Sequence, residues 1–104
     1  MDWQTILARI LGSYFSDWTL EEGVAQLILV TQSRPAYHEL YMITFEAALE
    51  AASEESQEVF DIINEYCYVE NIGDAQNLLK DILAEYERQY SLAIQQISSQ
   101  ENSS

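Results

Sequence analysis

The sequence predicts an all-α protein, a compact single-domain bundle of about five helices. Hydrophobic residues make up 48% of its 104 positions, which is typical of a folded globular domain rather than of a disordered chain. One proline and three glycines leave room for few turns, so the elements are expected to be long. Apolar residues recur at helical spacing, and no segment shows the clear alternation of a β-strand.

Two helices are expected in the first third of the chain. The first covers about 3–15 and includes Gly12, which weakens it slightly. Its apolar stripe is formed by Trp3, Ile6, Leu7, Ile10, Leu11 and Tyr14. Thr19 and Glu22 have the spacing of a capping box, so a second helix is expected to begin there. That helix ends before Pro35, because proline disfavours the helical conformation of the preceding residue. Its inner stripe is Leu20, Val24, Leu27, Ile28 and Thr31.

A third helix is expected over about 36–52 and a fourth shortly after it. The buried stripe of the third consists of Tyr37, Leu40, Tyr41, Phe45, Ala48, Leu49 and Ala52. Either Ser53 or Ser56 caps the fourth helix, which ends near Tyr68. The stripe of the fourth helix is Val59, Ile62, Ile63 and Tyr66, flanked by Phe60 and Cys67.

The clearest turn in the chain is the segment 71–74, and Asp74 is the expected N-cap of a long last helix. The inner positions of this helix are Leu78, Leu79, Ile82, Leu83, Tyr86, Tyr90, Ala93, Ile94 and Ile97. Residues 98–104 are polar and low in complexity, which predicts a disordered tail. The chain is therefore divided into a helical domain over 1–97 and a tail over 98–104.

The charge of the chain is unusual. Eighteen Asp and Glu residues face four Lys and Arg residues, so the formal net charge is −14. Binding to nucleic acid or to an anionic membrane depends on Lys and Arg, so neither is expected as a partner. The natural partners are cations, meaning a basic protein, a basic peptide or metal ions. The alternative is that the charge only keeps the protein soluble.

The sequence favours a cytoplasmic location. Cys67 is the only cysteine, so no intrachain disulfide forms, which suits a reducing compartment. The first residues lack the basic region and long apolar run of a signal peptide. The longest strongly apolar stretch, near 24–30, is far too short to span a bilayer.

Nothing in the sequence predicts an enzyme, a cofactor or a metal site. His38 is the only histidine and has no partner at metal-ligand spacing, so a structural or surface role is expected. A nucleophilic cysteine needs a base and a lowered pKa, so Cys67 is interpreted as a small apolar residue of the core. No calcium loop or glycine-rich phosphate loop is present.

The placement of the acidic residues is the most informative feature. Between Pro35 and Leu79 there is no Lys or Arg, while ten acidic residues occur: Glu39, Glu46, Glu50, Glu54, Glu55, Glu58, Asp61, Glu65, Glu70 and Asp74. Four of these are spaced by four, three and four residues and are expected to form one row on the fourth helix: Glu54, Glu58, Asp61 and Glu65. Each like-charged pair opposes helix formation by roughly 0.2–0.5 kcal/mol. The row is interpreted as a docking surface for a cationic partner, and a solvated face screened by salt is the alternative.

Two stretches resemble CdiI-type immunity proteins of bacterial contact-dependent growth inhibition systems. The first is LGSYFSDW at 11–18, followed by the capped helix from Thr19. In that family a Leu-Gly-x-Tyr-Phe segment ends the first helix, and an Asp-Trp pair follows. The second is Tyr66-Cys67-Tyr68, a loop and the last helix, which is similar to the family's Cys-Tyr-Tyr, loop and final helix. The sequence departs from the family where the last helix often carries a tryptophan.

The resemblance implies a cytosolic antitoxin that binds the C-terminal toxin domain of a cognate effector and blocks it. Such toxins are commonly nucleases, and a nuclease is basic because it holds phosphate. The candidate partner-binding residues are Glu54, Glu58, Asp61, Glu65, Tyr68, Glu70, Asp17 and Trp18. For Asp17 and Trp18 a structural role at the first corner is favoured over direct contact. The alternative function is an acidic helical adaptor that binds a basic protein or peptide.

Overall fold

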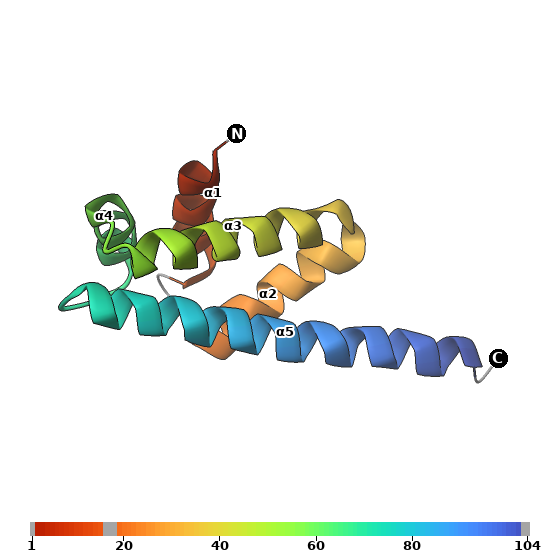
Figure 1. The fold of residues 1–104 in the computed structure, drawn as a ribbon. Coiled ribbons are helices and arrows are strands. Elements are labelled where there is room, and N and C mark those ends of the chain that lie inside the picture. Colours follow the sequence, from red (N-terminus) through yellow and green to blue (C-terminus); the bar gives the residue numbers. More distant parts are fainter. Residues whose placement is uncertain (1, 16–18, 103–104) are drawn as a thin grey trace.

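The computed structural model describes residues 2–15 and 19–102, and within them it confirms the all-α class and the expected five α-helices (Figure 1). A short π-helix, η1, joins the first two. The elements in chain order are α1 (Trp3–Ile10), η1 (Leu11–Phe15), α2 (Leu20–Ser33), α3 (Ala36–Ser53), α4 (Gln57–Tyr66) and α5 (Ile72–Asn102).

The long helix α5 organises the molecule. Figure 1 shows it running along the full length of the fold, with its C-terminal part extending beyond the other helices. α2, α3 and α4 each pack on α5, while α1 packs on α3 and α4. A helix of 31 residues is about 46 Å long, which accounts for most of the 51 Å long axis of the molecule.

The core lies where α2, α3 and α5 meet, and α1 closes it. The buried residues include Leu7, Val24, Leu27, Tyr41, Phe45, Ala48, Leu79, Ile82 and Tyr86, all of which belong to the expected stripes. Thr44 is buried as well, although the sequence did not predict it. Its hydroxyl donates to the Leu40 carbonyl oxygen at 2.8 Å, so its polar atom needs no water. Ile94 was expected inside but is 46% exposed.

Two of the expected helix caps are confirmed. The Glu22 amide donates to the Thr19 hydroxyl oxygen at 3.2 Å, and that hydroxyl donates to a Glu22 carboxylate oxygen at 2.9 Å. At the start of α4, the Val59 amide donates to the Ser56 hydroxyl at 3.4 Å, which selects Ser56 rather than Ser53 as the cap. Ser53 remains in α3, where its hydroxyl donates to the Glu50 carbonyl oxygen.

The cap expected at Asp74 is wrong. Asn71 caps α5, because its Oδ1 accepts a hydrogen bond of 2.9 Å from the Asp74 amide. Asp74 instead lies in the first turn, and its carboxylate accepts from the Glu70 amide at 3.1 Å. Asn and Asp are both common as N-cap residues and near the start of a helix. The sequence pattern alone therefore could not tell that Asn71, rather than Asp74, is the N-cap.

Three boundaries also differ from the expectation. The first helix changes from α to π at Leu11. α4 ends at Tyr66 rather than near Tyr68, since Cys67 has extended backbone angles. α5 continues to Asn102, so residues 98–102 are helical where a disordered tail was expected. Extending an existing helix requires no new nucleus, which lets a polar segment follow an established one.

Gly23 sets the packing of η1 against α2. A Cβ atom at this position would lie 2.4 Å from the Tyr14 carbonyl oxygen and 2.7 Å from a ring carbon of Phe15. Only a residue without a side chain permits this approach. The contact brings the Tyr14 end of η1 against α2.

Candidate functional site

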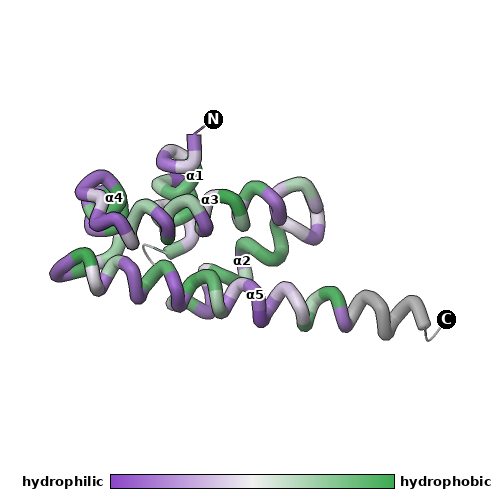
Figure 2. Tube along the Cα trace, viewed as in Figure 1, coloured by the Kyte–Doolittle hydropathy of each residue, from purple (hydrophilic) through white to green (hydrophobic). Residues whose placement is uncertain are grey.

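All ten acidic residues between Pro35 and Leu79 are exposed. Eight of them lie between the last turn of α3 and the first turn of α5, and we call these eight the acidic end: Glu50, Glu54, Glu55, Glu58, Asp61, Glu65, Glu70 and Asp74. Figure 1 places these segments together at one end of the molecule. Figure 2 shows hydrophilic residues on α4 and on the turn into α5. The negative charge is thus concentrated along the long axis.

The expected row on α4 is present in part. Glu58, Asp61 and Glu65 are exposed on α4, at spacings of three and four residues, while Val59 and Ile63 on its other side are fully buried. Asp61 accepts a hydrogen bond of 2.8 Å from Gln57 Nε2, one turn earlier. The row therefore points to solvent because its opposite side belongs to the core.

Glu54 does not belong to the α4 row, which corrects the sequence prediction. It is the C-terminal cap of α3, and its amide donates to the Ala51 carbonyl oxygen at 3.1 Å. Glu55 follows with a φ of 59°, in the left-handed region, so the chain turns before Ser56 starts α4. Spacing by four residues implies a shared helical face only when no turn interrupts the helix.

Among the large hydrophobic side chains that the structure describes, Tyr68 is the most exposed, with 84% of its surface accessible. Its neighbour Val69 is buried and holds the connection between α4 and α5 against the core. The Tyr68 hydroxyl donates to a Glu70 carboxylate oxygen at 3.3 Å. Tyr68 therefore projects an aromatic ring from an anchored segment, in the midst of the acidic end.

Two reactive residues prove to be packing residues. His38 Nδ1 and the Tyr86 hydroxyl share a hydrogen bond of 2.9 Å, and the His38 ring stacks on Tyr90 with centroids 3.8 Å apart. This is the structural role expected for His38. Cys67 is half-buried, and burial raises the pKa of its thiol, which keeps it protonated. Tyr66 packs beside Gly12, in agreement with the core role favoured for it.

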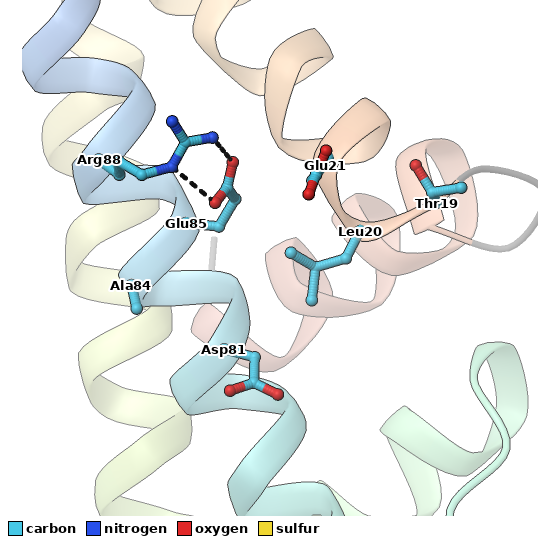
Figure 3. A pocket seen from close by; sticks show the side chains of 7 residues that line it. All are labelled: Thr19, Leu20, Glu21, Asp81, Ala84, Glu85 and Arg88. Atoms are coloured by element: carbon cyan, nitrogen blue, oxygen red, sulfur yellow. Dashed lines mark hydrogen bonds and ion pairs between the residues drawn. The ribbon is translucent and has the colours of Figure 1, made fainter.

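Asp17 and Trp18 lie outside the described residues, so their predicted contact role is untested. The residues that follow them line a groove of about 700 Å³ between α2 and α5. Figure 3 shows Glu21 of α2 opposite Asp81 and Glu85 of α5, with Glu85 held in an ion pair by Arg88. The Arg88 guanidinium and the Gln89 amide lower the pKa of the Glu85 carboxyl. Arg88 thus partly neutralises this groove, unlike the acidic end.

The sequence did not predict two further pockets, which lie beside each other in the fold. Tyr14, Tyr37 and Tyr41 line both of two adjacent pockets at the corner where η1, α2 and α3 meet. Tyr37 and Tyr41 had been assigned to the core stripe of the third helix. Their spacing of four residues, next to Arg34, was the available signal, but the same spacing also describes ordinary core packing.

Comparison with protein-family models, with curated proteins and with solved structures found no match for this chain. Within the described residues, no helix has the length and apolar character needed to cross a membrane. No group of three or more His, Cys, Asp or Glu side chains in that part of the chain is arranged to hold a metal ion.

Proposed function

We propose that the chain is an immunity protein that binds and neutralises a basic toxin domain of the nuclease class, delivered by contact-dependent inhibition. The observation that carries the proposal is the acidic end. Eight exposed carboxylates occupy 25 consecutive positions, 50–74, that contain no Lys or Arg. The family resemblance of the first corner supports the same function.

The acidic end lowers the stability of the isolated protein. On α4, Asp61 is three residues from Glu58 and four from Glu65, so it forms two like-charged pairs that each destabilise the helix. Interleaved Lys residues would keep the protein soluble without that repulsion. A positive partner removes the repulsion on binding, and its approach is accelerated by the field of the acidic end.

Tyr68 can supply binding affinity, which exposed carboxylates alone contribute only weakly. Exposed ion pairs contribute little affinity, whereas an aromatic side chain buried at the centre of an interface often contributes several kcal/mol. Tyr68 is exposed in the connection between α4 and α5, where Glu65 precedes it along the chain and Glu70 accepts its hydrogen bond. We therefore assign Tyr68 as the anchor of the interface and the acidic residues as its steering rim.

A nuclease toxin fits the sign and distribution of this charge. Its active face is positive because it holds a row of phosphates. A row of carboxylates spaced along a helix competes for the same cationic residues. The inhibitor then excludes the nucleic acid without any chemistry of its own.

The test uses the basic toxin domain that the proposal expects to be encoded next to this chain. Association is measured by stopped flow for the unmodified protein and for the triple variant Glu58→Lys, Asp61→Lys, Glu65→Lys. We expect association to slow by about 10-fold or more and to lose most of its salt dependence. Protection of cells that express the toxin should fall in parallel.

A matched control separates local contact from net charge. Glu21→Lys, Asp81→Lys and Glu87→Lys change the net charge equally, at exposed positions outside the acidic end. This control should retain most of the association rate and all of the protection. If the triple variant in the acidic end binds and protects as well as the unmodified chain, this proposal is wrong. Equal affinity for the toxin and for unrelated basic helical peptides would indicate the adaptor function instead.

A further inference from the structure

Two pockets share Tyr14, Tyr37 and Tyr41 as lining residues, and we call the pair the tyrosine groove. The pocket between α1, η1 and α3 has a volume of about 510 Å³, and the pocket between η1, α2 and the start of α3 about 470 Å³. Both volumes lie in the range of small-molecule sites. The groove is separate from the acidic end and independent of the function proposed above.

The Tyr41 hydroxyl is the first observation that points to a ligand. The Tyr41 side chain is only 4% exposed and lines both pockets. Among the described residues its hydroxyl has no hydrogen-bond partner, yet none of their fully buried polar atoms is unsatisfied, so the oxygen faces the groove. Burial, together with Tyr14 and Tyr37, raises the pKa of Tyr41 to about 12, so the group remains a hydrogen-bond donor.

The charge of the lining is the second observation. Arg34, one of the four cationic residues of the chain, lines the half of the groove between η1, α2 and α3. No carboxylate lines either pocket among the described residues, although the chain contains 18 acidic residues. Phenol and guanidinium groups donate hydrogen bonds, and Arg prefers planar carboxylates. The lining therefore selects an acceptor and disfavours a cation.

The walls of the groove are apolar. Ile6, Ile10 and Leu40 line one half, and Leu29 and Val30 line the other. The rings of Tyr37 and Tyr41 lie 5.8 Å apart at 47°, which leaves an aromatic edge between the halves. A flat apolar body fits against such walls.

We propose that the tyrosine groove binds a small aromatic carboxylate, with its ring against the apolar walls and its carboxylate on the Tyr41 hydroxyl and the flanking guanidinium of Arg34. The proposed ligand is an anion, whereas the net charge of −14 favours cations. Over long range the protein attracts cations, and only a local site reverses that preference.

Three probes with the same ring test this sign: 2-naphthoate, 2-naphthalenemethanol and 2-naphthylmethylammonium. Binding is followed by amide chemical shifts in ¹⁵N-labelled protein. Naphthoate should bind about tenfold more tightly than the ammonium probe, with the alcohol in between, because its carboxylate gains charge-assisted hydrogen bonds. The shifts should be confined to α1, η1, the C-terminal half of α2 and the first two turns of α3.

Paired variants locate the carboxylate. Tyr41→Phe removes only the hydroxyl and should weaken naphthoate binding severalfold, whereas Tyr68→Phe, outside the groove, should have no effect. Arg34→Gln and Lys80→Gln change the net charge equally, and only Arg34→Gln should weaken binding. The proposal is overturned if the ammonium probe binds best, if both charge variants act alike, or if no shifts appear around the groove.

Discussion

The acidic end and the tyrosine groove are opposite in nearly every physical respect. The acidic end carries eight exposed carboxylates on adjacent segments of the chain, and hydrogen bonds between near neighbours, such as those of Ser56 and Asn71, define its helices. The tyrosine groove carries hydrogen-bond donors and, among the described residues, no carboxylate, on four elements that meet only in the folded state. One is a property of local sequence, and the other is a property of packing.

This difference predicts different responses to substitution. The side chains of the acidic end contribute little to the core, so changing them should alter association while leaving stability almost unchanged or slightly higher. The groove is held by tight tertiary contacts, so changes there should lower stability first. Four measurements test this division, and they are described in order of decreasing effect.

Gly23→Ala should have the largest effect. The added Cβ would meet the Tyr14 carbonyl oxygen at 2.4 Å, and a backbone atom cannot move aside as a flexible side chain can. We expect a loss of about 3 kcal/mol in the free energy of unfolding, measured by urea denaturation. Gly73→Ala is the control, since its Cβ meets only the Asn71 side-chain oxygen, at 3.1 Å, and a change below about 1 kcal/mol is expected. Equal effects at the two glycines would contradict the close contact between η1 and α2.

Alkaline pH should have the second-largest effect, by lowering the free energy of unfolding through the ionisation of Tyr41. The pKa of Tyr41 is raised from 10.0 to about 12 in the folded protein, so the unfolded chain releases this proton first. The stabilising contribution is fully present below pH 10 and is lost as the pH rises from 10 to about 12. The loss is on the order of 2 kcal/mol for Tyr41. Tyr41→Phe should make the stability curve flatter in that window, and a slope identical to that of the unmodified protein would contradict the assignment.

Tyr86→Phe should cost about 1 kcal/mol. It deletes the hydrogen bond between the fully buried Tyr86 and the half-buried His38, and leaves His38 Nδ1 without that partner. Tyr68→Phe deletes the bond to Glu70, but there both groups are exposed to water, so thermal denaturation should show no change. Both substitutions remove one tyrosine hydroxyl, so the difference between them measures how much more such a loss lowers stability in the core than in the acidic end.

Asp61→Lys should have the smallest effect on stability, and one of opposite sign. It replaces two like-charged pairs, with Glu58 and Glu65, by two attractive ones, although it removes the bond from Gln57. A net gain of about 0.5 kcal/mol at low salt is expected, decreasing as salt is added. The same substitution should slow toxin association. A variant that is destabilised, or that binds the toxin faster, would contradict the role assigned to the acidic end.

The sequence predictions that succeeded depend on contacts within one helical turn, and those that failed depend on features beyond it. The capping box at Thr19 and Glu22 was predicted correctly because both bonding partners lie within one turn. Glu54 was placed on the wrong helix because the turn after it is made by Glu55 in the left-handed region. Glycine or asparagine is usual there, and neither is present to indicate the turn. Ile94 was assigned to the core because its spacing continues the apolar stripe, although its side chain is exposed in the folded protein. Periodicity reports which face of a helix is apolar but not whether another helix covers that face.

The sequence by itself determined the helices, most of the core and the negative charge without compensating cations between Pro35 and Leu79. All three depend on residues separated by a few positions along one chain segment. Only the tertiary structure decided that η1 touches α2 at Gly23, that His38 pairs with Tyr86, and that Tyr14 and Tyr41 share a groove. These contacts join residues that are 9 to 48 positions apart in the printed sequence, and their geometry depends on how whole helices cross, which no local spacing specifies.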